Sequence, residues 1–294
     1  MVNKHTQQPF DNVLPRPIRG QKHPLFKRLK RLGTAQGRAE EGLFLVDGPQ
    51  SMAWAIAYGA QPRGLLIVEG HPNAMPSEER ASLWTAMGER NCPIWSLSAG
   101  LMGRLMPIKP TPTCVAIMAR QPARLETVAL SEGLVQLVEN LVNPNNLGML
   151  LRTAEATGVD AVVLAGQSAD PWSRCVIRAS RGALFRLPIC LEPDVGQAIA
   201  TAKQRGLQCI ALETGASVSY TQVPAQGPIL IVVGNERHGV SPEALAAADM
   251  TAHLPMMGEL GSLNVSVAAS IMLYEARRQR RMAGPDHPEV ASQA

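Results

Sequence analysis

The sequence predicts an α/β protein of two units, of which the second has a parallel sheet covered on both faces. Three observations lead to this prediction. With 294 residues the chain is long for one domain and comfortable for two. Its composition, 46% hydrophobic and 18% charged, is typical of a globular protein with a sizeable core. Short apolar runs alternate with helical patterns along the second half, and this order is typical of parallel sheets.

The first unit is predicted to span residues 21–120. Before it, residues 1–20 are polar and proline-dotted and are expected to form a disordered basic arm. A helix is expected over residues 25–32, where Leu25, Leu29 and Leu32 share one face. Further elements are a strand at 43–47, a helix after Asp47-Gly48-Pro49, a strand at 65–70, a helix at 77–90 and a strand at 113–119. Residues 121–132 are predicted to be a linker.

The second unit is predicted to span residues 133–282, followed by a flexible tail at 283–294. Strands are expected at 134–140, 161–166, 187–192, 208–213 and 229–234. Helices are expected at 146–158, from Ser173 onward, at 195–206 and at 241–249. In the last of these, Ser241 is the expected N-cap and Pro242 the first helical residue.

Several classes of site and location are disfavoured. No GxGxxG follows the first strand of either unit, GNERHG lacks the residues of a phosphate-binding loop, and no GxSxG is present. The five cysteines form no CxxC pair and the six histidines have no metal-ligand spacing, so we expect reduced thiols and no metal. Apolar runs are too short for a membrane span and the N-terminus lacks a signal-peptide core, so we expect a cytoplasmic protein that binds no membrane.

Positive charge is unevenly distributed, although the net charge is only +4. Residues 12–39 contain no acid, and the helix at 25–32 carries candidate RNA-binding cations at Lys27, Arg28, Lys30 and Arg31. The last helix ends with four more arginines, at positions 277, 278, 280 and 281. Clustered cations favour a polyanionic partner, whereas a solvated arm explains them equally well on charge alone. A further candidate set for phosphate contacts shares one helical face: Arg174, Arg178 and Arg181.

Three polar stretches lie at strand ends or helix starts. In the first, Asn146 opens a helix that carries Arg152, at the edge where ligands of open α/β sheets bind. In the second, Gly234 and Glu236 follow a buried strand. In the third, Ser262 and Asn264 precede the last helix. Each stretch alone has a purely structural interpretation, in which Asn146 and Ser262 are helix caps, Arg152 is solvated and Gly234 forms a turn.

Together, in this order, the three stretches resemble the motifs of the SpoU/TrmH branch of the SPOUT RNA methyltransferases. The matching patterns are NxGxxxRTAEAxG at 146–158, GNExxGxS at 234–241 and LPMxGxxxSLNVSVAAxIxLYE at 254–275. The first unit resembles, by its layout and by segments such as FLVDGPQSMAWAI, the small L30e-like RNA-binding domain that many members carry. Asn143 stands where many relatives have aspartate.

The resemblance implies a fold, a reaction and a set of site residues. Expected are a deep trefoil knot, a homodimer and methyl transfer from S-adenosyl-L-methionine to a ribose 2′-hydroxyl of structured RNA, with 23S ribosomal RNA ahead of transfer RNA. The implied catalytic residues are Asn146, Arg152, Glu236, Ser262 and Asn264. The implied cofactor-binding residues are Gly234, Leu254, Met256, Gly258 and Leu263.

The role of Arg152 follows from its chemistry. A guanidinium is protonated in nearly every protein environment and is therefore a poor base. We interpret Arg152 as an electrostatic stabiliser of the developing alkoxide, with Asn264 and Ser262 orienting the ribose and Glu236 holding a loop. Two other classes compete with this enzyme: a catalytically inactive knotted protein that only binds RNA, and an α/β enzyme with another nucleotide cofactor. The intact motif residues disfavour the first, and the missing glycine motifs disfavour the second.

Overall fold

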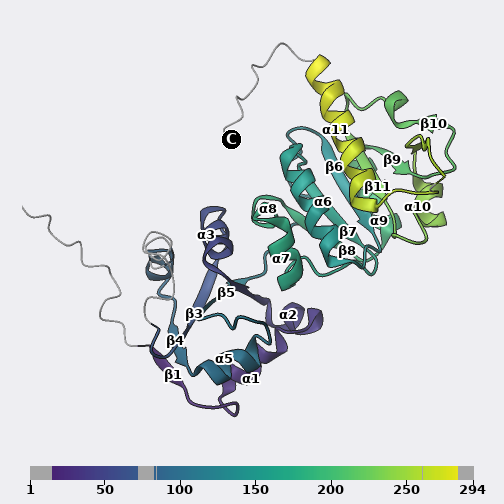
Figure 1. Ribbon diagram of the computed structural model, residues 1–294. Helices are drawn as coiled ribbons and strands as arrows, with labels where there is room; N and C mark the ends of the chain where they lie inside the picture. Colours follow the sequence, from purple (N-terminus) through teal and green to yellow (C-terminus); the bar gives the residue numbers. More distant parts are fainter. Residues whose placement is uncertain (1–14, 72–82, 84, 260, 284–294) are drawn as a thin grey trace, which may run out of the picture. The chain divides into compact units, whose positions relative to one another are not determined.

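The computed structural model describes residues 15–71, 83, 85–259 and 261–283. The chain forms two compact units, each with its own sheet (Figure 1). The first contains residues up to Gln121 and also the later segment Trp172–Phe185, and the second contains Pro122–Pro171 and the chain from Arg186 onward. The α/β fold class is as predicted, but the segment Trp172–Phe185, expected in the second unit, packs with the first. Of the helices in the described ranges, none has the length and apolar character needed to cross a membrane.

The first unit is built on a mixed five-stranded sheet in the order β1-β4-β3-β5-β2. Its strands are β1 (Arg16–Ile18), β2 (Leu43–Asp47), β3 (Pro62–Val68), β4 (Ile94–Leu97) and β5 (Cys114–Ala119). Its main helices are α1 (Pro24–Arg31), α2 (Ala35–Glu41), α3 (Pro49–Ala57), α5 (Ala99–Leu105) and α7 (Arg174–Ser180), with the short α8 (Ala183–Arg186) following. One core of this unit joins Phe26 and Leu29 of α1 and Met102 of α5 to the sheet. The amphipathic pattern of residues 25–32 thus does form a helix, with its leucines inward.

Two predicted boundaries are wrong. Arg16–Ile18 pairs in parallel with β4, so the expected disordered arm already contains an edge strand, while residues 1–14 lie outside the described part. The expected linker is packed rather than free, because Leu125 is 6% exposed within the second unit's core and Ala123 bridges to Cys190. The predicted flexible tail at 283–294 lies outside the described residues, except for Ala283, which ends the last helix.

The second unit has an all-parallel sheet of seven strands, in the order β10-β12-β9-β11-β6-β7-β8. The strands are β6 (Leu134–Glu139), β7 (Ala161–Ala165), β8 (Ile189–Glu192), β9 (Gln208–Leu212), β10 (Val218–Ser219), β11 (Ile229–Val233) and β12 (Met250–His253). The helices are α6 (Pro144–Ala156), α9 (Val195–Gln204), α10 (Pro242–Ala247) and α11 (Val265–Ala283), with a short 3-10 turn, η1 (Tyr220–Gln222). The predicted parallel sheet is confirmed, and the knot stays a prediction.

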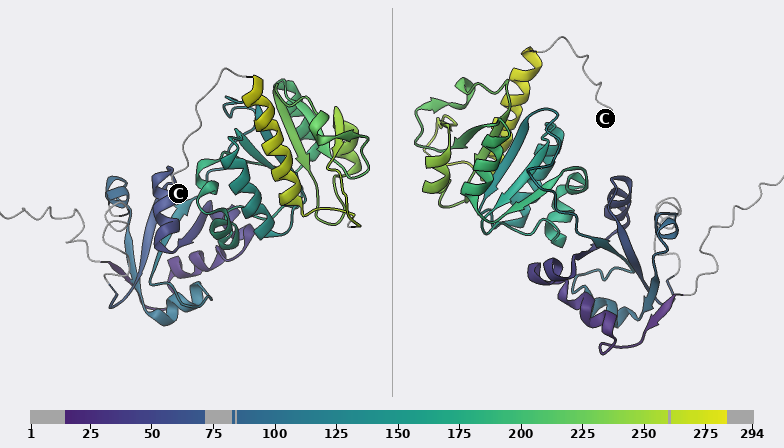
Figure 2. Two further views of the ribbon diagram at one scale, coloured as in Figure 1. Left: turned by 45° about the horizontal axis from the view of Figure 1, so that its top comes forward. Right: turned by 180° about the vertical axis from the view of Figure 1, so that it is seen from behind.

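Helices cover both faces of this sheet, as the runs of wholly buried residues in β6, β7 and β11 require. In Figure 1, α6 and α11 lie side by side in front of the sheet, and the two helices are in extensive contact. Helices α9 and α10 pack on each other and on the other face, as the turned views in Figure 2 show. The loops at the carboxyl ends of the strands are left uncovered and are available to form a site.

The arginines at the end of α11 are largely used within the protein. Arg277 pairs with Glu132 at 2.7 Å and Arg278 with Glu275 at 2.7 Å. Arg280 donates hydrogen bonds to four backbone carbonyl oxygens, those of Glu132, Gly133, Ala225 and Gly227, at 2.5–3.3 Å. The charges of these three residues are therefore at least partly compensated within the protein, and binding of a polyanion by this cluster stays a prediction.

We expect the Arg280→Ala variant to lose about 2–3 kcal/mol of unfolding free energy, because it leaves carbonyl groups on two loops without their charged donor. Urea unfolding measures this change. The neighbouring Arg281→Ala is the matched control, since Arg281 is exposed and its loss should change stability by no more than about 0.5 kcal/mol. Equal unfolding midpoints for the two variants would show that Arg280 does not join the helix to these loops.

Candidate active site

The carboxyl end of the second unit's sheet carries a cavity of about 250 Å³. Its walls come from the ends of β9, β11 and β12, from the loop that follows each of them, and from the start of α11. Two of the three motif stretches, at 234–241 and 254–265, contribute directly to the wall. This is the edge at which parallel α/β sheets bind their ligands.

The first motif lies at the start of α6. The side chain of Asn143 accepts a hydrogen bond from the Asn145 amide at 2.9 Å, and Pro144 occupies the first turn, so the helix begins earlier than predicted. Asn143 is therefore the N-cap, and the structural interpretation of Asn146 as the cap is wrong. Asn146 lies in the first turn, only 6% exposed, where its side chain must find polar partners.

A chain of hydrogen bonds links the three motifs through Asn146. Its side-chain amide nitrogen donates to Oε1 of Glu236 at 3.2 Å, and its oxygen accepts from Nδ2 of Asn264 at 3.1 Å. The same Oε1 of Glu236 accepts the backbone N–H of Asn143 at 3.1 Å. Residues 90 and 118 positions from Asn146 thus meet at one buried side chain. Three of the five predicted catalytic residues are brought together in this way.

Asn264 also caps the last helix. Its Oδ1 accepts hydrogen bonds from the backbone N–H of Ser266 at 3.0 Å and from the Ser266 hydroxyl at 2.5 Å, and α11 begins at Val265. The expectation that Ser262 is the cap is therefore wrong. Ser262 instead lies on the wall of the cavity with Leu263.

The second motif forms a tight loop that needs its glycine. The backbones of Asn235 and Gly239 exchange hydrogen bonds at 2.8 and 3.0 Å. A Cβ atom at position 234 would overlap the carbonyl group of Gly239, so only glycine fits without moving the loop. The side chain of Asn235 donates to the carbonyl oxygen of Asn140 at 2.8 Å, and Glu139, 3% exposed, accepts the N–H of Ser241 at 3.0 Å. These contacts fix the loop to the end of β6.

Most predicted cofactor-binding residues line the cavity, namely Gly234, Leu254, Met256 and Leu263. Gly258 does not line it, so that prediction is not supported by the geometry. Sequence reasoning missed several polar residues of the wall, among them Glu213, Asn235 and His253. Glu213 and His253 each stand at the carboxyl end of a strand, and this position is the feature that could have identified them.

Two buried polar atoms of the site have no hydrogen-bond partner within the described ranges, Oε2 of Glu236 and Nδ1 of His253. Buried polar atoms are nearly always paired, and a carboxylate oxygen can only accept. A ligand with hydroxyl or amino groups would satisfy both. S-adenosylmethionine carries such groups together with an apolar ring, and the cavity offers leucine, methionine and valine side chains beside the polar ones.

Of the five predicted catalytic residues, Glu236 and Ser262 line the cavity and Asn146 and Asn264 are linked to Glu236 by hydrogen bonds, whereas Arg152 does neither. It is exposed on α6, six residues after Asn146, which corresponds to about 9 Å along the helix axis. Met149, three residues before Arg152 on the helix, is also exposed, at 43%, as is Val142 before the helix, at 60%.

The predicted RNA-binding residues have different surroundings. Lys27, Arg28, Lys30 and Arg31 are all exposed on α1, but Arg28 and Arg31 form ion pairs with Glu41. Two of the four positive charges are therefore partly compensated by this carboxylate.

The predicted arginine face of α7 is not formed as expected. Arg174 makes a bidentate ion pair with Asp47 of β2, at 2.7 and 2.8 Å, and so serves the first unit's packing. The helix ends at Ser180, and Arg181 is left-handed at φ 48°, which takes it off the helical face. Of the three arginines, Arg178 is the one that is exposed within the helix.

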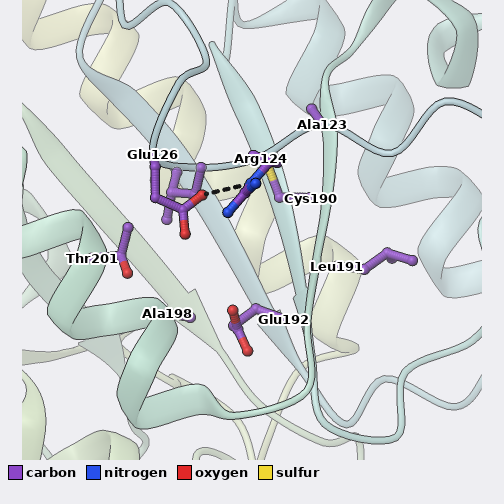
Figure 3. A pocket seen from close by; sticks show the side chains of 9 residues that line it. Ala123, Arg124, Glu126, Cys190, Leu191, Glu192, Ala198 and Thr201 are labelled. Carbon is purple, nitrogen blue, oxygen red and sulfur yellow. Dashed lines mark ion pairs between the residues drawn. The ribbon is translucent and has the colours of Figure 1, made fainter.

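A second cavity of this unit, of about 240 Å³, lies beside the segment predicted as a linker (Figure 3). Arg124 and Glu126 form an ion pair at 3.7 Å there, next to Cys190 and Glu192. Burial, with the nearby Glu126 carboxylate, raises the pKa of the Cys190 thiol to about 11, so the thiol is protonated at neutral pH. None of the motif residues lines this cavity, and in the described part of the chain no group of three or more His, Cys, Asp or Glu residues could hold a metal ion.

Comparison with known proteins connects this geometry to a family. The sequence profile of the SpoU rRNA Methylase family matches residues 133–274. An uncharacterised tRNA/rRNA methyltransferase of Synechocystis sp. is 30% identical over 264 residues, which are 90% of this chain and 94% of that protein. A putative TrmH family tRNA/rRNA methyltransferase of Staphylococcus saprophyticus is 36% identical over 58% of this chain, and the match spans 66% of that relative.

Solved structures agree over nearly the whole chain. The SpoU methyltransferase AviRb from Streptomyces viridochromogenes, in complex with the cofactor AdoMet, is 26% identical with a TM-score of 0.77, over 90% of this chain and 100% of its own. An RNA 2′-O ribose methyltransferase is 30% identical with a TM-score of 0.70, over 90% of this chain and 99% of its own. Sequence motifs, parallel sheet and relatives all agree: the chain belongs to the SpoU/TrmH family of SPOUT methyltransferases, whose cofactor is S-adenosylmethionine.

Proposed function

We propose that this protein is an RNA methyltransferase that transfers a methyl group from S-adenosylmethionine to a ribose 2′-hydroxyl. The observation that carries the proposal is the hydrogen-bond chain from Glu236, which lines the cavity, through Asn146 to Asn264. A relative that is an RNA 2′-O ribose methyltransferase supports the choice of the hydroxyl as acceptor.

The residues of the cavity suit the cofactor. The apolar part of the cofactor would contact Leu254, Met256 and Leu263. Because Gly234 has no side chain, the cofactor could also approach the backbone of this tight loop closely. The unpaired Nδ1 of His253 and the carboxylate of Glu213 are available for its polar groups. When bound, the cofactor supplies a sulfonium methyl group, which is an electrophile.

The residues of the chain activate and orient the acceptor. The 2′-oxygen forms a bond to the methyl carbon as the carbon–sulfur bond breaks, and the hydroxyl proton passes to solvent. Negative charge develops on the oxygen, and the Arg152 guanidinium stabilises it without leaving its protonated state. Asn264 and Ser262 hold the ribose, while the free Oε2 of Glu236 accepts a hydrogen bond from the substrate.

We further propose a homodimer formed through the surface that carries Arg152. On this surface α6 exposes Met149 and the preceding Val142, and the adjacent α11 exposes Val267 and Tyr274. Large apolar side chains gathered on two neighbouring helices are typical of subunit interfaces. Pairing two copies there would bury Arg152 next to the partner's surface, and this arrangement would allow it to reach a site that its own chain does not give it. Sedimentation at twice the monomer mass is the expected result.

The RNA target that we propose is 23S ribosomal RNA. The exposed cations of α1 and Arg178 support a structured RNA that is bound through its phosphates. Transfer RNA is the competing target.

Calorimetry and a transfer assay test the function together. The protein should bind S-adenosylmethionine, and labelled methyl should appear in 2′-O-methylnucleosides after digestion of a 23S ribosomal RNA transcript but not of a transfer RNA transcript. Binding without transfer to either RNA would favour the inactive RNA-binding protein. Label in a methylated base would contradict the proposed acceptor.

A further inference from the structure

The first unit contains a cavity of its own, of about 490 Å³. It lies between α1 and the sheet, at the edge where β2 and β3 begin and β5 ends. Its volume is within the range of about 300–1,000 Å³ that small-ligand sites have. The wall is mostly apolar and comes from leucines of α1 and from Trp95 of β4, and none of the motif residues contributes.

The Trp95 side chain packs against Gly64 of the neighbouring strand β3, which has no side chain of its own. At Gly64 a Cβ atom would overlap the Cζ3 atom of the Trp95 ring, so the indole lies directly over the backbone of β3. The pairing of β3 with β5 also shifts register between Pro62 and Gly64. A glycine at an irregular position within a strand marks close approach by another group, here the indole. The ring is half-buried and forms part of the cavity wall.

The lining of the same cavity also carries a net positive charge. Three arginines line it, Arg28, Arg63 and Arg120, against one acid, Glu41. The Glu41 side chain is 6% exposed and already pairs with Arg28 and with Arg31. Arg63 is exposed at the start of β3, and Arg120 stacks on the Trp172 ring at 4.4 Å. The cavity thus combines an apolar wall that includes an aromatic ring with three arginines against one carboxylate.

We propose that this cavity binds one unpaired nucleotide of the RNA substrate, with its base against Trp95 and its phosphate at Arg63. Proteins recognise unpaired bases by stacking them on aromatic side chains and by contacting the adjacent phosphates with cations. An apolar ligand would leave the exposed Arg63 without an anionic partner, and a free phosphate would leave the apolar wall unused. The inference rests on the proposed RNA substrate and adds a second, specific contact site to it.

Binding of a fluorescent hexauridylate RNA to the full-length protein tests the proposal, measured by anisotropy at several salt concentrations without S-adenosylmethionine. Trp95→Leu should weaken binding by about tenfold and leave the salt dependence unchanged, because stacking involves no ion release. Arg63→Gln should weaken binding about threefold to tenfold and lower the slope of log affinity against log salt by about one. Arg104→Gln is the matched control: Arg104 is an exposed cation of α5 that does not line the cavity, and we expect its change to stay within about twofold.

Crosslinking of the wild-type protein provides a second test that does not depend on the stability of the Trp95→Leu variant. A hexamer that carries 4-thiouridine should crosslink to the wild-type protein at Trp95 or an adjacent cavity residue, as located by mass spectrometry. No measurable hexamer binding by the wild type, or equal affinities for the Arg63→Gln and Arg104→Gln variants, would overturn the proposal and leave the cavity to another occupant such as a peptide. Because no methyl donor is present, these outcomes are independent of whether the protein methylates ribose.

Discussion

The Arg152→Ala variant is expected to lower the turnover number for RNA methylation by about 100-fold or more, while the dissociation constant for S-adenosylmethionine stays within about twofold. The physical reason is the charge that develops on the 2′-oxygen only as the methyl group is transferred. Arg152 is exposed on α6 and does not line its own chain's cavity, so its loss should leave the cofactor pocket intact. Single-turnover rates and calorimetric titration measure the two quantities.

Two further variants separate this role from a general charge effect. Arg152→Lys keeps the positive charge but not the forked geometry and should recover only part of the rate. Arg281→Ala removes the same charge from an exposed position on α11 and should keep full activity. Full turnover by Arg152→Ala would exclude Arg152 from the chemistry, and a loss of cofactor binding in that variant would assign it to the pocket instead.

The Gly234→Ala variant is expected to raise the dissociation constant for S-adenosylmethionine by about tenfold or more and to lower the unfolding free energy by about 1–3 kcal/mol. The added methyl group would overlap the carbonyl of Gly239, which is backbone and cannot rotate aside. The loop must therefore move, and with it Glu236, which hydrogen bonds to Asn146. Calorimetry and urea unfolding measure the two effects.

Gly215 provides the matched control for this prediction. It lies in the loop after β9, next to the cavity residue Thr214, and a Cβ atom there would have nothing within 4 Å. Gly215→Ala should therefore change neither cofactor affinity nor stability appreciably. Equal cofactor affinities for the two alanine variants would show that the tight loop at Gly234 is not needed for the pocket.

Much of the second unit is predictable from the sequence because its strands and helices carry local patterns. The wholly apolar runs at β6, β7 and β11 become buried parallel strands, and Ser241 accepts from the Ala244 amide as the expected cap. The three motifs also indicated the site, since each follows or precedes an element at the same edge of the sheet. Local pattern and tertiary structure agree in these places.

The structure differs from the sequence-based predictions where contacts between residues far apart in the sequence determine the local conformation. Asn143 and Asn264, rather than Asn146 and Ser262, cap their helices, because Asn146 is used by partners 90 and 118 residues away. Arg174 meets Asp47 across 127 residues, which no spacing rule within a helix can indicate. The strand at Arg16–Ile18 has only three residues and is formed by pairing with β4 rather than by its own apolar pattern. These features depend on how distant segments fold together.

Mapping of 2′-O-methyl groups in ribosomal and transfer RNA, from cells with and without the gene, tests the proposed methylation of ribose. We expect one ribose methyl group in 23S ribosomal RNA to disappear without the gene. The wild-type gene should restore it, and the Arg152→Ala gene should not. An unchanged set of ribose methyl groups, or the loss of a base methylation alone, would show that this protein does not methylate ribose.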